Sequence, residues 1–154
     1  MMYPCEIREQ AAQHVLSIRF RTPVQDLPTH FGRIYGSIMQ YMGALGGQDT
    51  GAAFAAYYNM DMQDMDVEAG FPVTKPLPGK GDIQAREIPA GTVAICHYTG
   101  PYENLRPAYD QLTQFAQNEG YTIGGPIYEF YLNGPDEVPP EELKTDIVFP
   151  VSAS

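Results

Sequence analysis

Basic residues are scarce in this sequence of 154 residues. It contains 9 Lys plus Arg against 19 Asp plus Glu, which gives a formal net charge of −10 at pH 7. Binding a polyanion requires clustered Lys and Arg to neutralise the phosphates, and here the basic residues are scattered. Direct binding to nucleic acid is therefore not expected. A negative field favours cations near any cleft, although an acidic surface is more often a solubility feature.

Long apolar runs are also missing. No stretch approaches the ~20 apolar residues that a membrane-spanning helix needs. The N-terminus shows no basic region followed by an apolar core, which is the pattern of a secretory signal. We therefore expect no membrane partner and a cytoplasmic protein, whose length is that of one domain with a sizeable core.

Metal-binding and redox motifs are absent as well. Cys5 and Cys96 lie far apart in the sequence and form no CxxC pair, so neither a zinc knuckle nor a redox motif is indicated. Both are expected to be reduced structural thiols. His14, His30 and His97 show no metal-ligand spacing, and we expect no metal or cofactor.

The periodicity of apolar residues divides the chain into strands and two helices. Alternation of apolar and polar residues indicates strands, and recurrence at three and four residues indicates amphipathic helices. Strands are predicted at residues 5–10, 14–21, 50–58, 60–73, 83–88, 92–99, 126–132 and 144–151, and helices at residues 27–45 and 104–119. Asn104 can cap the second helix. Residues 74–82 are rich in Pro and Gly and form the one linker-like stretch, near the midpoint.

Two glycines interrupt the first predicted helix. Gly32 and Gly36 lie four residues apart on one face, and each costs up to about 1 kcal/mol relative to Ala. Something is expected to need the space that they leave. Close packing against a sheet or helix is the preferred reason, with room for a ligand second.

One carboxylate is unusual in residues 125–132, a short apolar and aromatic run bounded by turn residues. Because side chains alternate along a strand, Ile127, Glu129 and Tyr131 share one face. A carboxylate between such neighbours loses hydration unless a hydrogen-bond donor, a basic side chain or a bound cation compensates it. The alternative is that this face meets water, since strand faces with a single charge are common. The residues alone leave both interpretations open.

The two halves of the chain repeat each other. Val15 and Phe71 have counterparts at Val93 and Phe149, and both pairs are separated by the same offset along the chain. Both halves read strand, helix, strand, strand, over about residues 3–75 and 83–152. Each half is too small to cover both faces of a sheet. We therefore expect one α+β domain, residues 1–154, in which two pseudo-symmetric strand-helix-strand-strand modules form an antiparallel sheet with two main helices and a central cleft for a ligand.

The repeat also sorts the candidate residues. In the middle of each half the offset is slightly shorter, so Tyr131 corresponds to Tyr57 and Glu129 corresponds to Ala55. The carboxylate is therefore unique to one half. His97 corresponds to Arg19 on the polar face of its strand, which favours a solvated histidine over a catalytic one.

Several motifs of the second half occur together in one known family. They are Tyr98–Leu105, Ala108–Tyr109, Gly124–Asn133 and Val138–Ile147, and the first half adds Asp66–Val73. In their order and spacing they resemble the gyrase-inhibitor-like (GyrI-like) small-molecule-binding family, which also supplies effector-binding domains of bacterial multidrug-responsive transcription activators. The resemblance covers nearly the whole chain.

The resemblance implies a concave, aromatic-lined pocket for lipophilic, often cationic compounds, and it places a pocket glutamate at Glu129. Such a carboxylate suits a delocalised organic cation, through charge pairing and a cation–π attraction of about 0.5–2 kcal/mol per ring. Binding of a lipophilic or cationic small molecule is therefore the leading hypothesis. The other wall candidates, for which ordinary core packing is an equally good explanation, are Tyr35, Met39, Tyr57, Phe71, Phe115 and Tyr131.

An enzymatic hypothesis stays open beside the first. Regulators of this family carry a DNA-binding segment ahead of this domain, whereas here the first strand is expected within a few residues of Met1, so we expect a stand-alone domain. Some stand-alone relatives are thought to be hydrolases that open strained cyclopropane-containing electrophiles with water. Glu129 would then act as acid or base, and Tyr131 or Tyr57 would polarise the substrate.

A third hypothesis is inhibition of a protein target such as DNA gyrase through an acidic face that imitates nucleic acid. Asp61, Asp64, Asp66 and Glu68 would form that face, and the last three alternate with apolar residues along the predicted strand. This hypothesis ranks last, because such a row of acids is far more often a solvated face.

Overall fold

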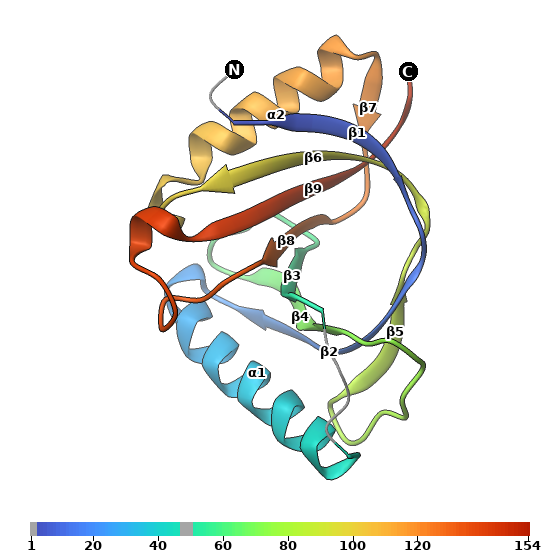
Figure 1. The fold of residues 1–154 in the computed structure, drawn as a ribbon, viewed down its shortest axis with the longest axis vertical. Coiled ribbons are helices and arrows are strands. Elements are labelled where there is room, and N and C mark those ends of the chain that lie inside the picture. Colours follow the sequence, from blue (N-terminus) through green and yellow to red (C-terminus); the bar gives the residue numbers. More distant parts are fainter. Residues whose placement is uncertain (1–2, 47–50) are drawn as a thin grey trace. The chain divides into compact units, whose positions relative to one another are not determined.

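The computed structural model describes residues 3–46 and 51–154, which form two compact units (Figure 1). One unit comprises Ala12–Pro89, and the other comprises Ala90–Ser154 together with the described residues of Met1–Ala11. Each unit contains one long helix and an antiparallel sheet, so the predicted α+β class is confirmed.

The elements follow the predicted order closely. The strands are β1 (Cys5–Gln10), β2 (Gln13–Thr22), β3 (Ala53–Tyr57), β4 (Met65–Pro72), β5 (Gln84–Ile88), β6 (Gly91–Thr99), β7 (Tyr121–Ile123), β8 (Ile127–Tyr131) and β9 (Lys144–Ala153). The helices are α1 (Leu27–Ala44) and α2 (Arg106–Asn118), with 3-10 turns at Val24–Asp26, Tyr102–Asn104 and Pro140–Glu142. No described helix is long and apolar enough to cross a bilayer.

Some boundaries differ from the sequence prediction. The three-residue strand β7 was not predicted, because it is too short to show a period. Asn104 does not cap α2, since it ends a 3-10 turn and the helix begins at Arg106. The strand predicted at residues 60–73 begins only at Met65. Thr50, at the start of the strand predicted for residues 50–58, lies outside the described residues.

In the unit Ala12–Pro89 the sheet order is β3-β4-β2-β5, and α1 packs on β4 and β2. Ile34, Ile38 and Met42 belong to the predicted apolar stripe, recur every four residues and are buried on this face. They contact a core that includes Leu16 and Phe71. The helix is therefore held by one apolar stripe, as its periodicity indicates.

The stretch predicted to be a linker belongs to this same core. Leu77 is 9% exposed and packs with Val73 and Ile83 in the cluster beneath α1. The hydroxyl of Tyr41 in α1 donates a hydrogen bond to the carbonyl of Pro78 at 2.7 Å. Residues 74–82 are therefore anchored, and the high content of Pro and Gly shapes a packed loop.

In the other unit the sheet order is β1-β6-β9-β8, with β7 also pairing to β9, and α2 packs on β6, β7 and β1. The small side chains of Ala108 and Ala116 flank Leu112, and all three are fully buried. Small residues let the helix approach the sheet closely. The core beneath α2 also contains Ile147 and Phe149 of β9.

The strand registers of the two units confirm the repeat. In one unit Val15 of β2 lies opposite Pro72 of β4, and in the other their counterparts Val93 of β6 and Pro150 of β9 lie opposite each other. Likewise Ala55 is opposite Ala69, and the equivalent Glu129 is opposite Ile147. The sequence offsets therefore correspond to equivalent positions in three dimensions.

The repeat halves and the structural units nevertheless differ in composition. β1 comes from the first half of the chain but pairs with β6, and β5 comes from the second half but pairs with β2. Each half therefore contributes its first strand to the unit that contains the other half's helix. Sequence periodicity identifies both strands but carries no information on their partners.

The preferred explanation of the two glycines in α1 is wrong. A Cβ atom on Gly32 or Gly36 would meet nothing within 4 Å, and both residues are exposed. Close packing against a sheet or helix therefore does not explain them. Gly32 and Gly36 lie on the face of α1 opposite the buried stripe. The apolar periodicity predicts which residues are buried and says nothing about the packing of this other face.

Candidate functional site

Glu129 lies in the middle of β8, on the face of the sheet that α2 covers. It is directly opposite Ile147, which is fully buried in the core beneath the helix. Opposed residues on neighbouring antiparallel strands point to the same face. Glu129 is consequently only 7% exposed, so the interpretation in which this face meets water is wrong.

Two tyrosine hydroxyls donate hydrogen bonds to the carboxylate. Tyr131, two residues along the same face of β8, donates to Oε1 at 2.7 Å. Tyr109 on α2 donates to Oε2. In the described ranges 3–46 and 51–154, no Lys or Arg forms an ion pair with Glu129. The buried acid therefore has donors but no positive partner.

Burial dominates the electrostatics of this carboxyl. It raises the pKa of Glu129 above the ordinary value, because the charged form loses hydration. The hydrogen bonds from Tyr109 and then Tyr131 oppose this effect by stabilising the anion, but they do not cancel it. Glu129 therefore binds its proton more tightly than an ordinary glutamate does, and a positive charge placed beside it would favour the ionised form.

The two tyrosines that hold the carboxylate each contact a further aromatic ring. Tyr102 meets Tyr131 edge to face, with ring centroids 5.7 Å apart, and Tyr109 lies 5.9 Å from Phe149. Burial raises the pKa of Tyr102, and the negative charge of Glu129 raises it further. Tyr102 is 37% exposed, so the ring that contacts Tyr131 reaches the surface.

Thr145 adds an unsatisfied polar group to the same face. It lies opposite Tyr131 on β9, and its hydroxyl is fully buried without a hydrogen-bond partner among the described residues. An unpaired buried hydroxyl costs about 1–3 kcal/mol. The face that carries Glu129 therefore has unused capacity for a hydrogen bond.

Comparison with known proteins identifies the family of this chain. The model of the GyrI-like small molecule binding domain matches residues 3–152. The chain belongs to the GyrI-like family. No curated protein matches the sequence.

Solved structures resemble the whole GyrI-like domain. The EcmrR C-terminal domain is 28% identical, with a TM-score of 0.83 and full coverage of both chains. EcmrR in a complex with DNA is 29% identical with a TM-score of 0.87, and the present chain aligns over its full length but spans only 59% of that chain. A hydrolase from Listeria innocua is 12% identical, with a TM-score of 0.70 over 96% of this chain and 91% of its own, and shares the fold.

The predicted wall residues of the GyrI-like domain are distributed over both units. Tyr131 and Phe115 lie in the unit of Glu129, where Phe115 packs on the core beneath α2. In the other unit Tyr35 donates to the carbonyl of Phe54 at 2.8 Å and meets Phe71 edge to face at 5.4 Å. Tyr35 and Phe71 therefore take part in core packing. The remaining two are Tyr57, half-buried on β3, and Met39, 62% exposed on α1.

Sequence reasoning missed Tyr109 and Tyr102 as neighbours of Glu129. Both lie inside segments that carry the family resemblance, and Tyr109 belongs to the apolar stripe of α2. That stripe faces the strand face that holds Glu129. Finding them requires knowing that the apolar stripe of α2 packs on the sheet face to which Ile147, Phe149 and Glu129 point.

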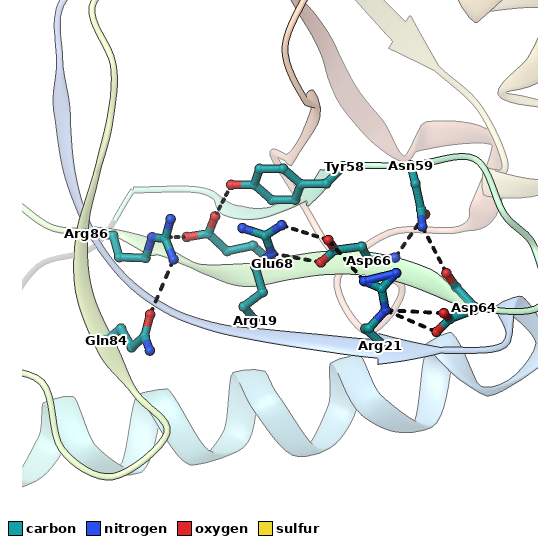
Figure 2. Close-up of polar contacts among 9 residues, drawn as sticks. All are labelled: Arg19, Arg21, Tyr58, Asn59, Asp64, Asp66, Glu68, Gln84 and Arg86. Atoms are coloured by element: carbon teal, nitrogen blue, oxygen red, sulfur yellow. Dashed lines mark hydrogen bonds and ion pairs between the residues drawn. The ribbon is translucent and has the colours of Figure 1, made fainter.

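Glu68 corrects a second expectation. Predicted to be solvated, it is 4% exposed and accepts hydrogen bonds from Ser17 at 2.5 Å and Tyr58 at 2.6 Å. Arg86 forms an ion pair with it at 3.5 Å (Figure 2). Ser17, Tyr58 and Arg86 lie on or next to three other strands, and sheet pairing brings them to Glu68. The alternation of residues along β4 alone does not reveal these contacts. Unlike Glu129, this buried glutamate has a positive partner.

The neighbouring acids are also paired. Arg19 forms a bidentate contact with Asp66 at 2.7 and 2.8 Å, and Arg21 contacts Asp64 at 3.2 Å (Figure 2). The hydrogen bond from Arg19 lowers the pKa of Asp66. Arginines on β2 therefore pair with Asp64 and Asp66, two of the four acids of the row that was expected to be an acidic face, and this weakens the nucleic-acid imitation hypothesis.

His97 is a bridge between two carboxylates, which differs from the predicted solvated histidine. Its Nε2 contacts Glu6 at 2.7 Å and its Nδ1 contacts Asp146 at 2.8 Å. Both ring nitrogens must donate to ionised carboxylates, so the geometry fits the imidazolium. The hydrogen bond to Glu6 is the largest cause that raises the pKa of His97. No group of three or more His, Cys, Asp or Glu side chains in the described part of the chain is arranged to hold a metal ion.

The raised pKa of His97 predicts how stability depends on pH. Its contribution is complete below the unfolded-state pKa near 6.5 and is lost as the pH rises through the higher folded-state value. The ring is 35% exposed, so we expect a loss of at most about 1 kcal/mol. Urea unfolding from pH 6.5 upward measures this decline, and His97→Gln should abolish it. An equal decline in the variant would contradict the assignment.

Proposed function

We propose that this GyrI-like domain binds lipophilic organic cations, with Glu129 as their counter-charge. The observation that supports it is a 7% exposed carboxylate held by two tyrosines, with no Lys or Arg ion pair within the described residues. Glu68, which is similarly buried, shows how the same protein neutralises a structural acid with Arg86. A cation from outside is the partner that Glu129 lacks.

The energetics favour a delocalised cation over a small hydrated one. A metal ion or ammonium would lose strong hydration on entering an apolar site, whereas a lipophilic cation loses little. Its aromatic groups gain apolar contact, and each ring face of Tyr102 or Tyr131 adds about 0.5–2 kcal/mol of cation–π attraction. The net charge of −10 raises the local concentration of cations.

Other wall residues stay predictions. They are Tyr35, Met39, Tyr57, Phe71 and Phe115, for which core packing or exposure accounts for what the structure shows. Tyr109 joins Glu129 and Tyr131 in the proposed site because it contacts the carboxylate directly. Its hydroxyl would orient the acid toward a ligand.

Titration with tetraphenylphosphonium tests the proposal. This cation is the ligand in the structure of SAV2435, which shares the fold at 14% identity, a TM-score of 0.67 and coverage of 99% of this chain and 94% of its own. Glu129→Gln removes the negative charge with little change in shape. We expect its affinity to fall at least tenfold, which is about 1.4 kcal/mol.

Two controls separate charge pairing from general effects. Glu119→Gln changes the net charge equally at an exposed position after α2 and should bind as the wild type does. A neutral aromatic compound of similar size should bind wild type and Glu129→Gln alike. Equal affinity of both proteins for tetraphenylphosphonium would contradict the proposal.

Hydrolysis is the second candidate, because the same carboxyl is suited to acid-base chemistry. Burial raises the pKa of Glu129, which favours the protonated form that a general acid needs, and the hydroxyl of Thr145 on the neighbouring strand has no partner among the described residues and would accept a hydrogen bond from a water. The reaction would be ring opening of a strained cyclopropane electrophile by water. Product formation followed by mass spectrometry, and lost in Glu129→Gln, would support it, whereas no turnover across a substrate panel would exclude it.

A further inference from the structure

The first strand of the chain brings two distant thiols together. Cys5 on β1 lies directly opposite Cys96 on β6. The amide of His97 donates to the carbonyl of Pro4 at 2.9 Å, which makes Cys5 and Cys96 a non-hydrogen-bonded pair of the antiparallel ladder. In such pairs the Cα atoms are about 4.5 Å apart and the side chains lie close. This separation falls within the range of about 4.4–6.8 Å found in disulfides.

The surroundings hold both thiols in place. Cys96 is fully buried beneath α2, whereas Cys5 is half-buried at the beginning of β1. Gln111 of α2 donates from Nε2 to Sγ of Cys5 at 3.5 Å and to the carbonyl of Tyr3 at 2.7 Å. The amide of Tyr3 donates in return to Gln111 Oε1 at 3.2 Å. The pair is thus fixed by a sheet register and by a helix contact.

We propose that Cys5 and Cys96 form an oxidation site, at which a small disulfide such as oxidised glutathione converts the two free thiols into one cross-strand disulfide. Both cysteines are free thiols in the structure. The bond would join the N-terminal strand covalently to β6. The inference does not rest on the proposed ligand binding at Glu129.

The chemistry balances as two thiol–disulfide exchanges. The thiolate of Cys5 attacks one sulfur of oxidised glutathione, and the first glutathione leaves as a thiolate that takes up the proton lost by Cys5. Cys96 then loses its proton and attacks the sulfur of Cys5, which expels the second glutathione. The protein loses two electrons and two protons, and one glutathione disulfide becomes two glutathione thiols.

The order of attack follows from exposure and acidity. Cys5 is partly accessible, whereas burial raises the pKa of Cys96 to about 12 and shields it from solvent. Burial also raises the pKa of Cys5. Because the thiolate is the reactive form, oxidation should accelerate as the pH rises.

Incubation of the reduced protein with oxidised glutathione tests the site. We expect both free thiols to disappear under denaturing conditions, the intact mass to fall by two hydrogens, and the protein to stay a single chain on a non-reducing gel. Tryptic digestion should link the peptide that ends at Arg8 to the one that begins at Glu87. Dithiothreitol should restore both thiols. The urea midpoint should be higher for the oxidised form, since the crosslink constrains the unfolded chain.

Cys5→Ser supplies the matched control. It should keep one unreactive thiol, gain no stability on oxidation and form no linked peptide. Persistent free thiols in the wild type, a stable glutathione adduct on Cys5, or disulfide-linked dimers would each overturn the proposal. The peptide map of the wild type decides the question even if a variant folds poorly.

Discussion

Below the raised pKa of Glu129, binding of a permanent organic cation is expected to weaken about tenfold for each unit of pH. The cation requires the ionised carboxylate, and burial makes this group bind its proton more tightly than an ordinary glutamate does. The decline therefore begins above pH 4.5, the ordinary value. Calorimetric titration with tetraphenylphosphonium from neutrality to pH 4.5 measures it, and binding should release a proton wherever the free acid is protonated.

Variants of the tyrosines sharpen this pH prediction. The hydrogen bond from Tyr109 lowers the pKa of Glu129, so Tyr109→Phe should move the decline to higher pH. Glu129→Gln should give a profile without this slope, and a neutral aromatic ligand should show none in any variant. Burial and the charge of Glu129 raise the pKa of Tyr102 above the ordinary value of a tyrosine, so Tyr102 does not titrate over this range. A wild-type affinity that is constant down to pH 4.5 would refute the role of Glu129 as counter-charge.

Replacement of Gly70 by Ala is expected to destabilise the protein by about 1–3 kcal/mol or to prevent folding. Gly70 lies on β4 between Ser17 of β2 and Phe54 of β3. A Cβ atom there would collide with the backbone carbonyl of Leu16 and lie 2.7 Å from Cα of Ser17. Because β2 is paired on both sides, by β4 and β5, this backbone cannot move away without breaking a ladder.

Gly36→Ala, in the same unit, is expected to change stability in the opposite direction. Its Cβ would meet nothing within 4 Å on the exposed face of α1, so we expect a gain of about 0.5–1 kcal/mol from helix propensity. Urea unfolding of both variants measures the contrast. Similar midpoints for Gly70→Ala and the wild type would show that β2 can yield at this point.

Gly70 also shows the limit of the internal repeat. Its counterpart in the second half is Val148, which lies opposite Ile95 and is buried. Comparison of the two halves suggests that a large side chain is acceptable there. The structure shows that the first half replaces this pair of bulky residues by Ser17 and Gly70, with the hydroxyl of Ser17 bonded to Glu68. Equivalent positions can therefore carry different packing.

The candidate site was predictable only in part. Glu129 was identified because a charge inside a short apolar strand departs from the local pattern, and Tyr131 follows from alternation along that strand. Tyr109, the second donor, lies on a different element and was missed. Its contact depends on α2 packing on the sheet face to which Glu129 points, which no local pattern specifies. The same reason explains why Glu68 was taken for a solvated acid.

The sequence by itself determined the order of strands and helices, the α+β class, the internal repeat with its constant offset at both ends, and the unusual position of Glu129. These follow from periodicities that act between neighbours along the chain. Only the tertiary structure decided that β1 and β5 exchange partners, that Cys5 meets Cys96, and that Arg86 reaches Glu68 while no Lys or Arg of the described residues pairs with Glu129. Such contacts join residues far apart in the sequence, because sheet register and helix packing, not local pattern, bring them together.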